Sequence, residues 1–209
     1  MNTYPYEIHL TVEYNDRKEI FRVICQKVGI KPVIIDLQRD GAVVDVHFMT
    51  SSNLHGTLDD AMLAVKQQTW FLEHFDFKVI RYKIESVPWH EDSPKGENEK
   101  CRNAPATQYF EAHLQFGLSS DASLKRFAVI VKDFDGAHMS RNPYKVTADG
   151  WVQMVTLRSD LNMWKFRHLT DYLESRLYGY KILKIEREFV VVDSNLNHDN
   201  TWFLPSPLR

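Results

Sequence analysis

The sequence predicts an α+β protein made of two tandem βαββαβ repeats, and three features support this prediction. Residues 6–10 (YEIHL) recur as residues 110–114 (FEAHL) about halfway along the chain. The segments after the two copies run through a similar order of strand and helix patterns. An Asp-Gly pair, which is a strong hairpin signal, occupies a matching place in each half, at 40–41 and 149–150. A duplication with pseudo-two-fold symmetry accounts for all three features.

Composition restricts the classes of function. A chain of 209 residues with 44% hydrophobic and 26% charged residues is typical of a globular protein. The formal net charge of −2 provides no general field that would attract nucleic acid or an anionic membrane, so we expect neither as a partner. Any anion site must therefore be local. Composition gives no prediction of the oligomeric state.

Several sites and locations can be set aside from motifs. Cys25 and Cys101 lack a CxxC partner, which argues against a zinc-thiolate site or a disulfide framework. No Gly-rich phosphate loop, Ser-His-Asp signature or HExxH motif occurs, and no cofactor is expected. Residues 1–5 lack the basic segment of a signal peptide and no run reaches the roughly 18 apolar residues that span a bilayer, so a cytoplasmic location is expected.

The first strand and helix show two different periods. Over residues 6–13 apolar and polar residues alternate, which is typical of a half-buried strand. Over residues 17–28 the apolar residues fall at helical spacing, and Gly29 stands where a helix C-cap belongs. A strand followed by a helix is therefore predicted at the start of the repeat.

A hairpin, a second helix and a last strand complete the first repeat. Residues 32–37 predict a strand whose proline comes early, where a missing donor is tolerated. Residues 42–49 predict its antiparallel partner across the turn at 40–41. Residues 50–56, rich in Ser, Asn and Gly, predict a loop. The last two expected elements are an amphipathic helix over 58–72 and a strand over 77–87.

The second repeat follows the same order. Its expected elements are a strand over 109–116, a helix over 124–134, a short strand over 145–147, a strand over 151–157, a helix over 163–177 and a strand over 180–192. Residues 140–142 are expected in a turn between the first helix and the short strand. Each repeat has the order βαββαβ, which is the ferredoxin-like plan.

A charged, proline-containing stretch separates the repeats. We expect a first domain at 1–89, a linker at 90–107, and a second domain at 108–209 that includes a C-terminal tail. Because the linker lacks apolar periodicity, residues 90–105 are expected to be exposed and sensitive to proteases.

The free face of each sheet carries charge where apolar residues are usual. In a ferredoxin-like unit both helices cover one face of a sheet ordered 4-1-3-2, so the other face of the central first strand is free. That strand presents Glu7, His9 and Thr11 in the first repeat and Glu111, His113 and Gln115 in the second. The flanking strands add Asp45, His47, Arg81, Lys83 and Glu85 in the first repeat, and Gln153, Lys184, Glu186 and Glu188 in the second.

Three interpretations of the duplicated Glu and His stay open. They can pair with one another and hold the repeats together in a non-catalytic structural or interaction module, since an unpaired buried charge costs several kcal/mol. They can instead line a shared cleft in which His9 and His113, beside Glu7 and Glu111, form an acid–base pair. In the third interpretation Glu7, His9 and His47 converge on one metal ion.

An anion clamp is suggested by the second repeat. Ser140, Arg141 and Asn142 in the expected turn, with Thr156 and Arg158 on the next strand, supply a guanidinium fork, hydroxyls and turn amides. A capped turn and an edge ion pair would explain the same residues. The expected ligand-binding residues also include Thr11, His47, Arg81, Lys83 and Lys184. Near the end of the chain, residues 193–195 and Asp199 predict a turn or ligand contacts.

Two resemblances accompany these patterns. Residues 136–142, 155–158 and 192–195, together with 6–9 and 83–85, resemble a bacterial family of unknown function built from two such repeats. More locally, His9-Leu10-Thr11 resembles one half of the paired His-x-Thr/Ser motif of the 2H phosphoesterases. That resemblance implies action on cyclic or 2′,5′-linked phosphates, with His9 as acid or base and Thr11 as phosphate ligand. The second motif here is His113-Leu114-Gln115, without the hydroxyl.

The function that these patterns favour is binding of a small anionic ligand, such as a phosphate ester, between the polar sheet faces, with hydrolysis or transfer as its chemistry. The alternative is a non-catalytic structural or interaction module. The sequence leaves open whether the protein is an enzyme.

Overall fold

The computed structural model describes residues 2–39, 42–97, 108–148 and 150–199. In these ranges the first half of the chain forms β1 (Tyr4–Val12), α1 (Lys18–Lys27), β2 (Lys31–Arg39), β3 (Ala42–Gly56), α2 (Leu58–His74) and β4 (Val79–Ser86). The second half forms β5 (Tyr109–Leu118), α3 (Asp121–Lys132), β6 (Ala137–Thr147), β7 (Gly150–Ser159), α4 (Met163–Arg176), β8 (Lys181–Asp193) and the 3-10 turn η1 (Leu196–Asp199). The predicted α+β class with two βαββαβ repeats is confirmed.

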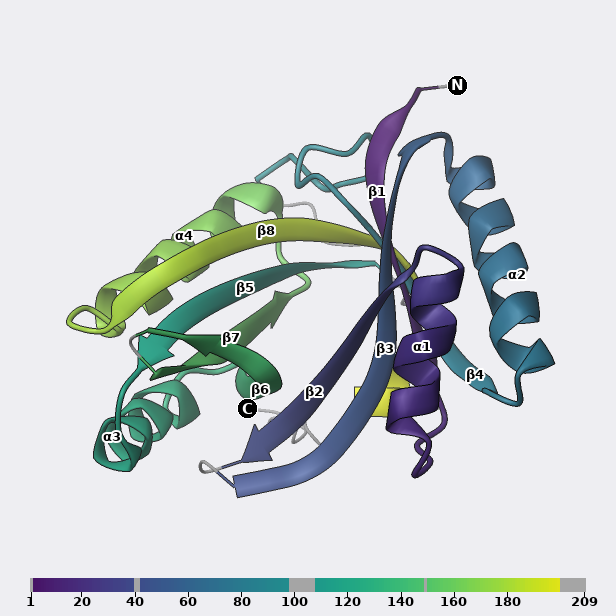
Figure 1. Ribbon diagram of the computed structural model, residues 1–209. Coiled ribbons are helices and arrows are strands. Elements are labelled where there is room, and N and C mark those ends of the chain that lie inside the picture. The colour runs from purple at the N-terminus through teal and green to yellow at the C-terminus, as the bar shows by residue number, and fades with distance from the viewer. Residues whose placement is uncertain (1, 40–41, 98–107, 149, 200–209) are drawn as a thin grey trace.

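The two sheets close into one barrel. The halves contribute antiparallel sheets in the orders β4-β1-β3-β2 and β8-β5-β7-β6, each with its first strand central as predicted. The edge strands then pair across the halves, β2 with β6 through residues 36–38 and β4 with β8 through residues 83–86. These two seams complete the ring, which can be followed in Figure 1.

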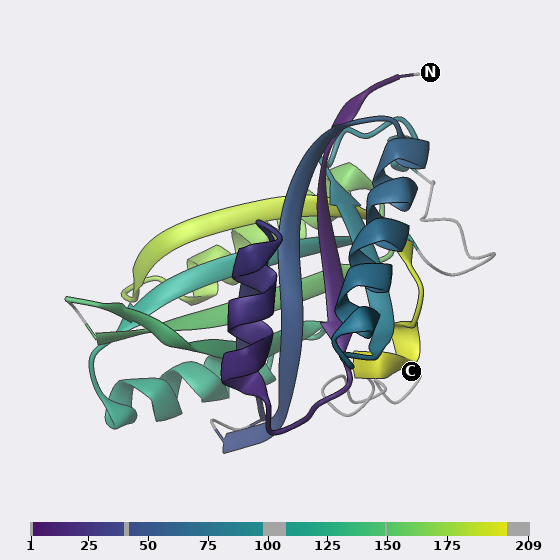
Figure 2. The ribbon, with the colours of Figure 1, turned by 45° about the vertical axis from the view of Figure 1, so that its right-hand side comes forward.

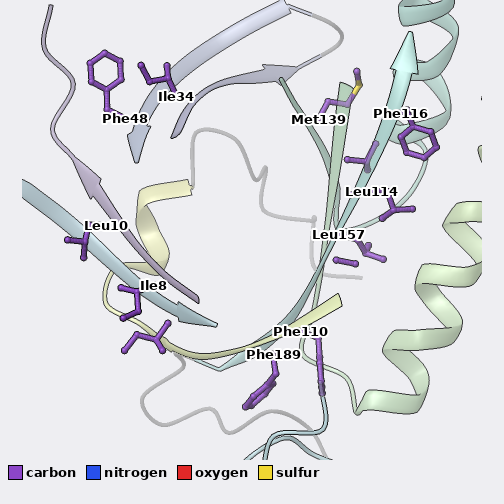
Figure 3. Close-up of a cluster of buried hydrophobic side chains, with 14 of the residues drawn as sticks. Ile8, Leu10, Ile34, Phe48, Phe110, Leu114, Phe116, Met139, Leu157 and Phe189 are labelled. Atoms are coloured by element: carbon purple, nitrogen blue, oxygen red, sulfur yellow. The ribbon is translucent and has the colours of Figure 1, made fainter. Parts of the chain in front are cut away.

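The helices lie outside the barrel and leave its inside uncovered. α1 and α2 cover the outer face of the first sheet, and α3 and α4 cover that of the second (Figures 1 and 2). Core side chains such as Leu10 on β1 and Phe116 on β5 point away from the middle of the ring, toward the helices (Figure 3). The free sheet faces predicted from the repeats are therefore the inner wall of the barrel.

The alternation in the central strands decides which side chains face inward. On β1, Ile8 and Leu10 are buried on the outer side, whereas Glu7 and His9 face the interior. β5 repeats this arrangement. A central strand has neighbours on both edges, so successive residues can only alternate between the helix side and the interior.

The two Glu-x-His motifs hold equivalent places in the barrel. Glu7 stands opposite Glu85 of β4 in the strand register, and Glu111 stands opposite Glu188 of β8. The duplication inferred from the sequence is therefore also present in the inward-facing chemistry.

The predicted loop at 50–56 is wrong, because β3 continues to Gly56. This half of β3 pairs with β1, where Ile8 stands opposite Ser52 and Glu7 opposite Asn53. Ser52 exchanges hydrogen bonds with Gln68 of α2. The pairing and these local partners make a polar stretch a strand.

The predicted turn at 140–142 is also wrong. β6 runs from Ala137 to Thr147 and pairs with β7 on one side and β2 on the other. Ser140 and Arg141 have a paired strand on both edges, which holds their backbone extended. The register of the β6–β7 pairing shifts just after them, where Asn142 and Pro143 lie. The hairpin residues 40, 41 and 149 lie outside the described residues.

Part of the expected linker is packed against the barrel. His90 and Ser93 are buried, and the His90 ring accepts or donates a hydrogen bond with the Tyr6 hydroxyl at 3.1 Å. The expectation of exposure is therefore wrong at these positions: the His90 ring packs against Tyr4, Tyr6 and Phe189, and the Ser93 hydroxyl donates to the His90 carbonyl. Residues 98–107 and 200–209 lie outside the described residues, so the division at 1–89, 90–107 and 108–209 stays a prediction. None of the helices in the described ranges has the length and apolar character needed to cross a membrane.

Candidate functional site

The barrel encloses a polar cavity of about 680 Å³. Side chains from all eight strands and from η1 line it, and most of them are polar or charged. Its basic residues are Lys31, Arg81, Lys83, Lys145, Arg158 and Lys184, its carboxylates are Glu7, Glu111, Glu186, Glu188 and Asp199, and its histidines are His9, His47 and His113. A cavity of this size matches small-molecule sites, which commonly measure about 300–1,000 Å³.

Lys83 links the two halves at the floor of the cavity. Its ammonium lies 2.5 Å from a carboxylate oxygen of Glu85 and 2.5 Å from one of Glu111. Burial alone would raise the pKa of Glu85, but Lys83 and His9 lower it to about 2. Burial opposes ionisation of Glu111 too, and Arg158 and Lys83 hold its pKa well below its ordinary value. Both carboxylates are therefore ionised and paired.

His9 is fixed in its charged form. Its Nδ1 lies 2.9 Å from the carbonyl oxygen of Thr50, and its Nε2 lies 2.9 Å from Glu85. Both neighbours only accept hydrogen bonds, so both ring nitrogens must carry protons. Burial lowers the pKa of His9, but the charge of Glu85 and the hydrogen bond to it raise the pKa by more. His9 is accordingly an imidazolium with both donors engaged.

His113 is held differently, although it occupies the equivalent place. Its Nδ1 lies 3.1 Å from the Thr156 hydroxyl, and its Nε2 lies 3.7 Å from Glu188 and 4.0 Å from Glu111. Burial outweighs these carboxylates and lowers the pKa of His113. The ring is therefore neutral, with Nε2 outside hydrogen-bond distance of either carboxylate.

Glu188 has the opposite protonation preference to Glu85. Burial and the nearby charge of Glu85 raise the pKa of Glu188 to about 10. Near neutral pH the carboxyl group is therefore protonated. The second repeat thus sets a neutral acid beside a neutral histidine, whereas the first sets a carboxylate beside an imidazolium.

Lysines gather at one end of the cavity. Lys184 pairs with Glu186, and Lys145 donates to the side-chain carbonyl of Gln115 at 2.6 Å. Burial, Lys184 and Lys31 lower the pKa of Lys145. Among the described residues, no carboxylate lies within ion-pair distance of Lys31 or Lys145. Within the described ranges, Glu186 therefore offsets the charge of Lys184, whereas Lys31 and Lys145 add positive charge to this rim without an ion-pair partner.

Arginines occupy the other end. Arg81 and Arg158 both pair with Asp199 of η1, at 3.0 and 2.5 Å. In addition, Arg81 donates from its Nε to Asp193, and Arg158 donates from its Nε to Glu111.

One cluster in the described part of the chain has metal-ligand spacing. Glu85, His113 and Glu188 bring three ligand atoms within 4.8 Å of one another. Lys83 and His9 already neutralise Glu85, at 2.5 and 2.9 Å, and a divalent ion would be repelled by them. Glu7, His9 and His47, the metal set considered from the sequence, do not form such a group among the described residues, and His47 stacks on His198.

Most of the predicted site residues meet in the cavity. Those that line it are Glu7, His9, His47, Arg81, Lys83, Glu111, His113, Ser140, Thr156, Arg158 and Lys184. Thr11 is buried but does not line it. Arg141 and Asn142 do not line it either: Arg141 pairs with Asp36 across the β2–β6 seam, and Asn142 accepts from the backbone amide of Tyr144. Gln153 faces the helix side and donates to Gln38.

Sequence reasoning missed Lys31 and Lys145. Both stand at positions given to strand ends, Lys31 just before Pro32 and Lys145 in the short strand predicted at 145–147. β2 begins at Lys31, so alternation along the full strand places Lys31 on the same inner face as Val33 and Ile35. β6 likewise extends over Lys145.

Comparison with known proteins assigns no family, since no family model and no curated protein matches the chain. Among solved structures, the acetolactate synthase small subunit from Thermotoga maritima aligns at 10% identity over 92% of this chain and 96% of its own, with a TM-score of 0.29. A heme-binding protein from Thermus thermophilus aligns at 12% identity over 90% of this chain and 92% of its own, with a TM-score of 0.30. Values this low establish neither a shared family nor a shared ligand.

Proposed function

We propose that the barrel interior binds a small organic anion, such as a phosphate ester, and acts on it as a hydrolase or transferase. The observation that supports this most is the lysine rim of Lys31, Lys145 and Lys184. Like charges held together cost free energy unless a counter-charge joins them. An anionic group entering the cavity at this end would supply that counter-charge.

Proton transfer in this proposal belongs to the second repeat. His113 presents a neutral Nε2 to the cavity, and Glu188 is a protonated acid 3.7 Å away. Groups whose pKa values are pushed apart are suited to act as base and acid. His9, with both nitrogens engaged, has the role of a fixed charge that keeps Glu85 ionised. Glu7 and Glu111 then serve the site as partners of His9 and of Lys83.

Ligand binding can be tested by calorimetry with glycerol phosphate and a nucleoside monophosphate, each beside its unphosphorylated parent. Binding of the phosphorylated compound alone is expected. The Lys31→Met/Lys145→Met double variant lacks two of the cations that would pair with the anion. It should bind at least about tenfold more weakly, a loss of about 1.4 kcal/mol of binding free energy. Lys165→Met, on the exposed surface of α4, is the matched control and should bind as the wild type does. Equal affinity in the double variant would exclude the lysine rim as the anion site.

Catalysis is tested separately with a panel of phosphate mono- and diesters. Once a substrate is found, His113→Gln is expected to lower the rate by about 10²–10⁴-fold, which is the usual contribution of a general base. Ligand affinity measured with the same variant should stay near the wild-type value. A variant that retains full activity would remove His113 from the mechanism.

A further inference from the structure

Two arginines at the far end of the cavity are oriented by carboxylates of the barrel wall. Asp193 of β8 accepts from Nε and Nη2 of Arg81, at 2.8 and 2.5 Å. Glu111 of β5 accepts from Nε of Arg158 at 2.9 Å. Arg158 also lies over the ring of Tyr109, 4.8 Å from its centroid. Arg81 is thus held by two bonds along one edge, and Arg158 is held at its Nε and by the Tyr109 ring. Nη1 of Arg81 and Nη2 of Arg158 face the same point.

Asp199 occupies that point. Its carboxylate accepts from Nη1 of Arg81 at 3.1 Å and lies 2.5 Å from Nη2 of Arg158. The residue is only 2% exposed, yet it lines the cavity. It belongs to η1, a four-residue turn that follows β8 and is not part of the barrel wall. Two wall arginines are therefore bridged by a carboxylate from a separate segment.

A carboxylate between two guanidinium groups shows which ligand chemistry this place accepts. Arginine binds carboxylates and phosphates through parallel N–H donors, and such charge-assisted bonds are the strong ones. Nη1 of Arg81 and Nη2 of Arg158 should keep their directions without Asp199, because Asp193 holds the other edge of Arg81, and Glu111 and the Tyr109 ring hold Arg158. The pair is therefore pre-organised for an anion independently of η1.

The two arginines lie at a different level of the barrel from the lysine rim. Arg158 stands opposite Glu111 in the register of β5, whereas Lys184 stands opposite Gln115, four residues further along the same strand. At about 3.3 Å per residue the two rows are about 13 Å apart. The arginine pair and the lysine rim are thus two separate groups of basic side chains in one cavity.

We propose that Arg81 and Arg158 form a second anion subsite, specific for a carboxylate or phosphate group, and that Asp199 fills it from within the chain when no ligand is bound. This deepens the function proposed above: an incoming ligand with an anionic group at this end competes with Asp199. Displacement of Asp199 would release η1 from the arginines, leaving the stack of His198 on His47 as a remaining contact.

Chemical rescue tests the subsite. Asp199→Ala removes the carboxylate and leaves room for formate. Formate at about 100 times its dissociation constant should raise the melting temperature of this variant by roughly 5–10 °C, saturably, relative to chloride at equal ionic strength. Wild type, whose subsite is filled, and Asp59→Ala, which changes an exposed helix residue, should respond much less. A formate response of equal size in all three proteins would overturn the proposal.

Inorganic phosphate in place of formate distinguishes the two ligand classes. A larger rescue by phosphate assigns a phosphate subsite, a larger rescue by formate assigns a carboxylate subsite, and no rescue by either contradicts the proposal. If Asp199→Ala does not fold, Asp199→Asn keeps the shape of the side chain. Calorimetry should then show phosphate binding at least about tenfold tighter than in wild type, and equal binding would contradict the proposal.

Failure of the two proposals can be told apart. Formate rescue of Asp199→Ala does not need the lysine rim, so it should persist when Lys31→Met and Lys145→Met are added. Rescue of Asp199→Ala by formate without any binding of phosphate esters by the wild type would contradict the proposed function and leave the arginine subsite supported. Binding of phosphate esters by the wild type without formate rescue of Asp199→Ala would contradict the arginine subsite and leave the proposed function supported.

Discussion

The ammonium of Lys83 lies 2.5 Å from Glu111, a residue of the other repeat, and this buried ion pair joins the two halves of the barrel. Lys83 also pairs with Glu85 of its own strand at 2.5 Å. Its position on β4 places it beside one of the two seams that close the ring. Stability of the whole barrel should therefore depend on this one cation.

Replacing Lys83 with Met leaves two buried carboxylates without their shared partner. Breaking a buried pair in this way costs roughly 3–5 kcal/mol, and urea unfolding should show a loss of this size. Lys184→Met, on the same inner wall but 54% exposed, should cost less than about 1 kcal/mol. Comparable losses in the two variants would mean that Lys83 has no special role in joining the halves.

Acid should weaken the barrel through Glu85 and Glu111. The folded state lowers the pKa of both carboxyl groups, to about 2 for Glu85, below its ordinary value of 4.5. Groups of this kind add stability above the unfolded pKa and lose it as the pH falls through the folded pKa. The free energy of unfolding should therefore drop between about pH 4.5 and 2. A denaturant series across this range that shows no drop would contradict the ion-pair assignment.

Glu188 should have the opposite effect. Its pKa of about 10 in the folded protein lies above the ordinary 4.5, so the folded state binds one more proton than the unfolded state between these values. Stability should then fall as the pH rises, by up to about 1.4 kcal/mol per pH unit for one proton. Glu188→Gln should remove this slope and raise the melting temperature at pH 8. If stability of Glu188→Gln falls with pH as steeply as that of the wild type, the extra proton of the folded state is not on Glu188.

The two histidines should respond differently to the same substitution. His9→Gln removes a cation that pairs with Glu85 and binds the Thr50 carbonyl, so a loss of about 2–4 kcal/mol is expected. Among the residues that the structure describes, His113 has one hydrogen bond, to Thr156, and no carboxylate closer than 3.7 Å, so His113→Gln should cost less than about 1.5 kcal/mol. Thermal and urea unfolding of both variants check this. Equal losses would contradict the asymmetry between the repeats.

Local pattern was enough to predict the repeats and the inner wall. The alternation around His9 and His113 depends only on a strand being central, and the structure confirms both motifs in equivalent places. On β7 the strand was predicted correctly but the face given to Gln153 was wrong. Gln153 and Thr156 stand an odd number of residues apart on β7, so they cannot share a face, and only Thr156 lines the cavity.

Closure of the barrel could not be predicted in the same way. The β2–β6 seam brings Asp36 to Arg141, which is 105 residues away in the chain, and Arg81 meets Asp199 over 118 residues. The residues next to these four in the sequence do not indicate the pairing, because an Arg or Asp on an edge strand has the same sequence neighbours in an open sheet as in a closed barrel. At Ser140 and Arg141 the expected turn was overridden by strand pairing on both sides.

The packed start of the expected linker gives the last prediction. His90 lies against Tyr4, with ring centroids 4.3 Å apart, and shares a 3.1 Å hydrogen bond with the Tyr6 hydroxyl. Burial lowers the pKa of His90, so the ring is neutral and its contribution should be lost as the pH falls below its ordinary value of 6.5. His90→Ala removes the ring and leaves a buried hydroxyl unpaired, which should destabilise the protein by about 2–4 kcal/mol.

Tyr6→Phe is the matched control for His90→Ala, because it removes only the hydroxyl and should cost about 0.5–1.5 kcal/mol. In limited proteolysis, cleavage within residues 90–94 should be slow in wild type and fast in His90→Ala. Rapid cleavage of the wild type within 90–94, or a His90→Ala variant as stable as wild type, would mean that this stretch is a free linker after all.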